Sequence, residues 1–223
     1  MCDTYKITFS LQTPVSFIDI PTFDGLLSYA YVRELMQKRG VPFVQKTSYT
    51  DSEVINFSDM PIEKHEKGYF ISSRMYFDGK VEIEYTQRWR KRWDTKNDNM
   101  ADFGKSKRKV DISRGQFKSY DVPISTKAVS ECWFYFRSGN IGEVKYLIQK
   151  WIHFIGKKRA QGYGMIKDFV VEEADFDFSG IYRPIPIHLL EVDDMLENGG
   201  MRIAYCAWRP PYWEPKNFTK CAV

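Results

Sequence analysis

The chain has 223 residues, of which 43% are hydrophobic and 16% aromatic, and its formal net charge at pH 7 is +4. A chain of this length and composition can bury a sizeable core, which excludes a disordered protein. Four cysteines without a close pair, no signal-peptide pattern and no apolar run near the ~20 residues that span a bilayer predict a cytoplasmic protein with reduced thiols and no membrane contact.

The first part of the chain is predicted to form a strand, a loop and a helix. Over residues 4–13, apolar side chains alternate with polar ones in the period-2 pattern of a half-buried strand. Residues 24–38 carry apolar side chains at the spacing of one helical turn. Asp24 stands where a helix-capping residue is expected, and Gly40 marks the helix end.

Several strands are predicted in the middle of the chain. Residues 68–77 and 80–87 are both rich in β-branched and aromatic side chains, and the Asp-Gly pair at 78–79 between them is a strong signal for a β-hairpin. Residues 122–136 contain a further β-rich run, which predicts one more strand.

Positive charge is concentrated in residues 86–118, which we call the basic arm. This window holds eleven lysines and arginines against four aspartates, a local charge of +7, whereas the rest of the chain carries −3. It has no sustained apolar period, so we expect a loop or a projecting hairpin with a polyanion as its partner. Trp89 and Trp93 alternate with cations and offer planes on which bases stack. The alternatives are an exposed charged loop without a role, or indoles that anchor the arm on its own body or on a neighbouring subunit.

An apolar helix followed by a glycine-rich turn is the most informative feature of the sequence. Apolar residues form one stripe over 141–155, and a strand is predicted at 163–172. The glycines of the turn permit a positive φ and a close approach of another backbone; they are Gly156, Gly162 and Gly164. Three cations at 157–159 add charge, so the turn offers oriented N–H groups and positive side chains to a nucleic-acid phosphate. The alternative is that these cations only complement the dipole of the helix C-terminus.

The C-terminal part of the chain is predicted to contain a short helix at 189–196 and a strand at 202–208. Residues 208–213 then read Trp-Arg-Pro-Pro-Tyr-Trp, a rigid aromatic surface of the kind that covers a sheet. An edge of this kind is also suited to touching a nucleic-acid duplex.

Three landmarks spread over most of the chain carry a resemblance to a known family. They are Leu-Gln-Thr-Pro-Val at 11–15 leading to Pro-Thr-Phe-Asp-Gly-Leu-Leu at 21–27, the turn at 156–164, and Arg-Pro-Pro-Tyr-Trp at 209–213. With them the sequence resembles the CRISPR-associated RAMP superfamily of modified RNA-recognition-motif folds, and in particular the type IV member of the Cas-five family. The order of the predicted elements is itself compatible with a ferredoxin-like α+β module that carries an inserted arm.

The resemblance implies one RAMP domain over residues 1–223, with 86–118 as an inserted thumb and 181–223 as a C-terminal extension packed on the body. It implies a non-catalytic subunit of a type IV effector complex that binds the 5′ handle of a CRISPR RNA and caps one end of a backbone filament. The thumb would lie across the guide and kink it. The implied partners are CRISPR RNA, the filament subunit and the large subunit, with target DNA as a further candidate, and no metal or cofactor is implied.

The candidate RNA-binding residues come from the turn and from the arm. Those of the turn are Lys157, Lys158, Arg159, Gln161, Gly162, Tyr163 and Gly164. Those of the arm are Arg88, Trp89, Arg90, Lys91, Arg92, Trp93, Lys105, Lys107, Arg108 and Lys109. The ring of Tyr163 either packs inward or stacks on a base.

Catalysis gives the alternative function. Some RAMP proteins are metal-independent endoribonucleases with a histidine as general acid or base, so the chain is alternatively an enzyme that processes precursor CRISPR RNA. His153 is the candidate for that role, because His65 and His188 have no recognisable partner set. Paired acids at 172–173 and 193–194 diverge on regular structure, so no metal site is predicted. A third possibility is an assembly protein whose arm clasps a partner.

Overall fold

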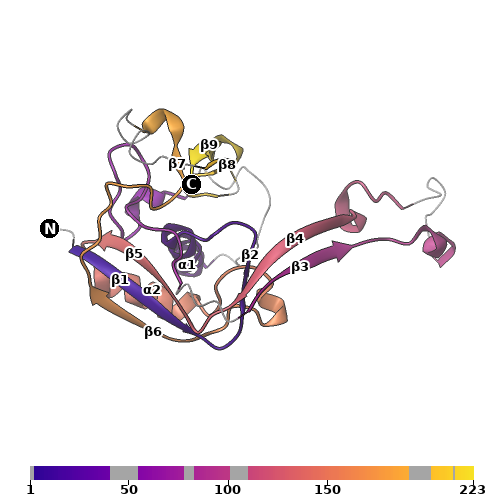
Figure 1. Cartoon of the computed structure of the whole chain (residues 1–223), viewed down its shortest axis with the longest axis horizontal. Coiled ribbons are helices and arrows are strands. Elements are labelled where there is room, and N and C mark those ends of the chain that lie inside the picture. The colour runs from indigo at the N-terminus through magenta and orange to yellow at the C-terminus, as the bar shows by residue number, and fades with distance from the viewer. Residues whose placement is uncertain (1–2, 41–54, 78–82, 101–109, 191–201, 213) are drawn as a thin grey trace.

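The computed structural model describes residues 3–40, 55–77, 83–100, 110–190, 202–212 and 214–223. In these residues the chain is a mixed α+β structure with two α-helices and three antiparallel sheets of three strands each. Figure 1 shows a body built around the helices, from which two long strands project.

The main sheet has the N-terminal strand at its centre, where it pairs antiparallel with both neighbouring strands. Its strands, in spatial order, are β5 (Glu131–Ser138), β1 (Asp3–Leu11) and β6 (Ile166–Glu173). Ile7 and Phe9 of β1 are completely buried in the core, whereas Thr8 between them is not. The strands predicted over 4–13 and 163–172 are therefore confirmed.

Both helices pack in one core with this sheet. They are α1 (Phe23–Lys38) and α2 (Ile141–Trp151). The predicted range of the second helix is wrong at its end, because Ile152 already has an extended backbone and the N–H of Ile155 donates to the carbonyl of Gly164 at 2.8 Å. Ile152 and Ile155 remain buried, so the apolar period continues beyond the helix itself.

Asp24 is not the cap of the first helix, contrary to the prediction. Thr22 occupies the N-cap position, and Asp24 lies in the first turn with its side chain fully buried. The reason is a partner far along the chain, because the Asp24 carboxylate forms an ion pair with Arg183.

The basic arm is a projecting hairpin, one of the two forms predicted for it. Its sheet has the order β2 (Val15–Phe17), β4 (Tyr120–Ala128) and β3 (Ile83–Lys91). Figure 1 shows β3 and β4 leaving the body together, with short 3-10 turns at the far end. Because β3 begins at Ile83, the ribbon starts slightly before the predicted window of 86–118.

Two strand predictions in this region are wrong. Residues 68–77 do not pair with β3; they lie beside β5 through isolated bridges such as Ser72 with Phe136, while β3 pairs with β4. The Asp-Gly pair at 78–79 lies outside the described residues. The single strand predicted at 122–136 is two strands, β4 and β5, which belong to different sheets and are separated by Val129 and Ser130.

The C-terminal residues form the third sheet, which lies beyond α1 from the main sheet (Figure 1). Its strands are β7 (Ile185–Pro186), β9 (Phe218–Ala222) and β8 (Ile203–Ala207), of which only the last was predicted. The short helix predicted at 189–196 lies mostly outside the described residues.

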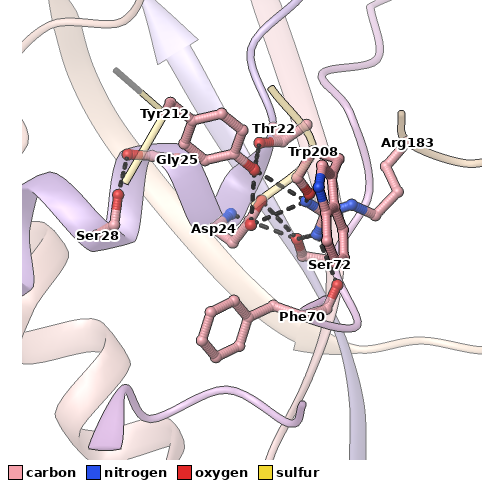
Figure 2. A network of polar contacts seen from close by, with 9 residues as sticks. All are labelled: Thr22, Asp24, Gly25, Ser28, Phe70, Ser72, Arg183, Trp208 and Tyr212. Carbon is pink, nitrogen blue, oxygen red and sulfur yellow. Dashed lines mark hydrogen bonds and ion pairs between the residues drawn. The ribbon is translucent and has the colours of Figure 1, made fainter. Parts of the chain in front are cut away.

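A buried polar network joins this sheet to the first helix (Figure 2). The guanidinium of Arg183 lies 3.0 Å from the carboxylate of Asp24 and donates to the carbonyls of Phe70 and Trp208, both at 2.6 Å. The hydroxyl of Tyr212 donates to Asp24 at 2.7 Å, and burial raises the pKa of Tyr212, so that hydroxyl keeps its proton. The tail residue Tyr212 thus helps hold the C-terminal part on the body.

Candidate nucleic-acid interface

The glycine-rich turn runs from the end of α2 to β6 and is held against β2 and the residue before it. Gly156, Gly162 and Gly164 have positive φ values of 85°, 84° and 68°. A Cβ atom on Gly156 would overlap the carbonyl oxygen of Ser16, and one on Gly164 would overlap that of Ile155. The predicted positive φ is therefore confirmed for all three glycines, and the predicted close backbone approach for Gly156 and Gly164. It is wrong for Gly162, where a Cβ atom would have nothing within 4 Å.

Five backbone N–H groups of the turn donate hydrogen bonds within the chain. The N–H of Lys157 donates to the carbonyl of Ser16 at 2.6 Å, and that of Gly164 to the carbonyl of Pro14 at 2.8 Å. The others belong to Gln161, Gly162 and Tyr163. The expectation that the turn offers oriented N–H groups is wrong for these five, because fixing the turn in place uses them. These five groups are therefore not free to bind a phosphate, whereas the charged side chains of the turn can do so.

The three cations of the turn point to different parts of the molecule. Lys157 is exposed. Lys158 has a left-handed backbone, with φ of 57°, and its ammonium lies 2.6 Å from the amide oxygen of Gln87 in β3. The guanidinium of Arg159 lies 5.1 Å from the ring centre of Tyr29 in α1. The turn therefore has one free-standing cation, one directed to the arm and one directed to the first helix.

Gln87 links the arm to the turn. Its amide oxygen accepts from Lys158, and its amide nitrogen donates to the hydroxyls of Tyr163 and, at 3.1 Å, Tyr85. The hydrogen bond from Gln87 lowers the pKa of Tyr163, whereas a hydrogen bond with Tyr163 raises that of Tyr85. The root of the arm and the glycine turn are thus one connected surface.

The arginines of the arm share a single carboxylate. Arg88 and Arg90 donate from Nε to the two oxygens of Asp121, at 2.9 and 3.1 Å, and Arg92 lies 4.0 Å away. The hydrogen bond from Arg88 lowers the pKa of Asp121, so the carboxylate is ionised at neutral pH. Three guanidinium groups around one carboxylate leave positive charge on this face of the ribbon, where the arginine side chains stay more than half exposed.

The two tryptophans pack on other aromatic rings of the arm. Trp89 meets Tyr120 edge-on at 5.5 Å, and Trp93 meets Phe117 at 5.1 Å. The indole N–H of Trp93 also donates to Asp98 at 2.6 Å. These contacts stiffen the arm internally, yet 40% of Trp89 remains exposed and able to stack on a ligand.

Comparison with known families decides what kind of protein carries this surface. The family model described as CRISPR type IV associated protein Csf3 matches residues 3–223. The chain belongs to the Csf3 family. The match includes the turn, the arm and the C-terminal tail, and it confirms the resemblance to a type IV CRISPR-associated protein. None of the curated proteins compared with the sequence matches it.

In this Csf3 family member the structure brings together some of the predicted site residues. Lys158 and Tyr163 of the turn meet β3 of the arm at Gln87. Lys105, Lys107, Arg108 and Lys109 lie outside the described residues. Sequence reasoning missed Tyr29, Tyr85, Gln87 and Asp121. Alternation along β3 places Tyr85, Gln87 and Trp89 on one face, a signal that becomes readable only when the strand and its register are known.

Two histidines of the Csf3 chain lie in different surroundings. His153 lies just after α2, is exposed, and lines an open hollow with Gln149, Lys167 and Asp168. His65 stacks on Tyr69 with ring centres 4.6 Å apart, and its Nδ1 accepts from the N–H of Lys67. Among the described residues, no three potential ligands come together as a metal site, and no helix has the length and apolarity needed to cross a membrane.

Proposed function

We propose that this Csf3 family member is a non-enzymatic, RNA-binding subunit of a type IV CRISPR effector complex. It binds the 5′ handle of the CRISPR RNA and caps one end of the backbone filament, next to the filament subunit and the large subunit. The observation that carries the proposal is the set of hydrogen bonds made by Gln87. These bonds join the glycine turn and the basic arm in one surface of cations and aromatic rings.

The strand order supports a ferredoxin-like RAMP fold. Residues 70–77, β5, β1 and β6 lie side by side in that order, and α1 follows β1 as α2 follows β5. This is the order of a β-α-β-β-α-β module, with the arm inserted between its second and third strands. We therefore treat the chain as one RAMP domain, with 86–118 as its thumb and 181–223 as an extension held by Arg183.

The mechanism follows from the chemistry of the two segments. Cations at Lys157, Arg159 and the arginines of β3 bind phosphates, which supplies affinity that falls as salt concentration rises. Aromatic rings such as Trp89 and Tyr163 stack on bases that are unpaired and splayed, as single-stranded RNA allows. A handle that is held on both the turn and the arm has a fixed path at the end of the filament.

The first test compares RNA affinities of the purified chain. A cognate repeat-derived 5′-handle RNA and a scrambled RNA of equal length are titrated at two salt concentrations, and each RNA is checked on a gel afterwards. We expect tighter, salt-sensitive binding of the intact cognate RNA. Equal binding of both sequences contradicts handle recognition, and RNA cut in the presence of EDTA by the wild type but not by His153→Ala contradicts the non-enzymatic role.

Charge reversal locates the binding surface. The triple variant Lys157→Glu, Lys158→Glu and Arg159→Glu should weaken binding and flatten its salt dependence. The matched control reverses three exposed lysines elsewhere, Lys145, Lys216 and Lys220. Equal losses in both variants would mean that net charge alone, and not the turn, determines the affinity.

A further inference from the structure

Gln87 makes an unusual set of contacts for a residue at the root of a basic arm. Its carboxamide oxygen lies 2.6 Å from the ammonium of Lys158, and its nitrogen donates to the hydroxyls of both Tyr163 and Tyr85. Lys158 reaches this position with a left-handed backbone, a conformation that residues other than glycine rarely adopt. Three side chains from two distant segments are thereby held by one amide.

The hydrogen-bond partner of Lys158 is neutral, so the ammonium keeps its full charge for binding a phosphate. A carboxylate at position 87 would neutralise Lys158 and repel a phosphate, whereas an amide oxygen fixes the direction of the ammonium and leaves its charge uncompensated. The arginines on the other face of β3 are treated differently, since Asp121 compensates part of their charge. Lys158 is therefore a positioned cation that no described carboxylate pairs with.

Aromatic surface lies directly beside this cation. The Lys158 ammonium is 5.7 Å from the ring centre of Tyr163. Tyr85 lies two residues before Gln87, on the same face of β3, and 37% of it is exposed. On the partner strand, Ile124 opposite Gln87 is buried, so the amide stands at the edge of the core with the tyrosines flanking it. A charge for one phosphate and a ring for one base are thus adjacent.

We propose that Tyr85, Gln87, Lys158 and Tyr163 form a subsite for one unpaired nucleotide, in which Gln87 is the positioning residue. The ammonium of Lys158 binds the phosphate, and the base stacks on the exposed tyrosine surface. This inference rests on the proposed function, because it concerns the RNA that the turn and the arm bind together. It adds that the two segments act as a unit, and that a neutral side chain at position 87 is needed for this.

The test uses an isosteric change of charge. Gln87→Glu keeps the shape of the side chain and can still accept from Lys158, so folding is retained while the ammonium becomes paired. We expect the affinity for single-stranded handle RNA to fall at least threefold, and the dependence of log K on log salt to become shallower by about 0.7, the value for one phosphate contact. Gln37→Glu, which adds the same charge at an exposed position near the end of α1, is the control.

Four further measurements separate positioning from other roles. In a Lys158→Met background the effect of Gln87→Glu should shrink, because its target is gone. Tyr85→Ala should lower the affinity about fivefold or more without changing the salt slope, since stacking is uncharged. Urea unfolding of each variant checks that the fold persists, and Gln87→Met, which removes both hydrogen-bonding atoms, should also weaken binding.

The outcomes are distinct. If the wild-type chain binds no RNA, the proposed function fails and the subsite with it. If the wild type binds but Gln87→Glu binds equally well, or loses no more than Gln37→Glu, the subsite is overturned and the proposed function stands. An equal loss for Gln87→Glu with and without Lys158 would show a structural role and overturns the positioning role as well.

Discussion

The guanidinium of Arg183 and the carboxylate of Asp24 form an ion pair at 3.0 Å in which neither side chain is accessible to solvent. Arg183 comes from the C-terminal part of the chain and Asp24 from the first turn of α1, 159 positions apart. Because a lone buried charge is costly, each partner makes the other tolerable in the core. The pair therefore couples the C-terminal sheet to the folding of the body.

Breaking this pair should destabilise the whole protein. We expect Arg183→Met to lower the free energy of unfolding by about 3–5 kcal/mol, because Asp24 is left buried without its counter-charge. Asp24→Asn should cost a similar amount, and the double variant less than the sum of the two. Urea unfolding followed by circular dichroism measures this. The exposed Arg202→Met should stay within about 0.5 kcal/mol of wild type, and a similarly mild Arg183→Met would contradict the coupling.

The glycines of the turn should differ in their tolerance of a methyl group. Gly162→Ala meets nothing within 4 Å and carries only the cost of its positive φ, about 1–2 kcal/mol. Gly156→Ala and Gly164→Ala must also displace backbone carbonyls, so we expect about 3 kcal/mol or more. Gly180→Ala, in open space without a positive φ, is the control. Urea unfolding ranks the four variants, and equal costs for all would show that the turn adapts freely.

Glu34 should make the stability of the protein depend on acid pH. Burial by itself would raise its pKa, but hydrogen bonds from Lys150, Trp151 and Tyr146 outweigh burial and lower the pKa to about 2. In the unfolded chain the pKa is near 4.5, so as pH falls the unfolded state takes up this proton first. The stabilisation is therefore present above about pH 4.5 and is lost as pH falls towards 2.

Glu34→Gln provides the comparison for this prediction, because other carboxylates titrate in the same range. Stability is measured by urea unfolding at several pH values from 6 to 2. The wild-type curve should fall more steeply than that of the variant between about pH 4.5 and 2. Two parallel curves would show that the Glu34 carboxylate contributes no differential proton binding.

Local patterns in the sequence predicted the parts of the fold that local chemistry determines. The alternation over residues 4–13 corresponds to β1, and the positive φ values of Gly156, Gly162 and Gly164 follow from what only glycine permits. The projecting arm was also foreseeable, because a basic segment without an apolar period has no face to bury. In each case the signal and the structure lie within the same few residues.

Long-range partners determined the parts that sequence could not predict. The Asp-Gly pair at 78–79 favours a hairpin between neighbouring segments, but Ile83 pairs with Ala128 and the strand of the arm follows that register. Asp24 is of a residue type that often caps helices and lies close to the start of α1. Its ion pair with an arginine 159 positions away makes it a core residue instead. Gln87 belongs to no sequence motif, and its contact with Lys158 depends on how the arm packs against the turn.

Removing the carboxylate of Asp121 should strengthen the binding of RNA. Arg88 and Arg90 each donate a hydrogen bond to this carboxylate, which also cancels one of the positive charges on this face of the ribbon. Asp121→Asn should therefore raise the affinity for handle RNA and steepen the salt dependence by about 0.7 per added phosphate contact. Asp177→Asn, which changes the net charge equally outside the arm, is the control. A fall in affinity for Asp121→Asn would mean that the carboxylate serves to hold the guanidinium groups in their binding positions.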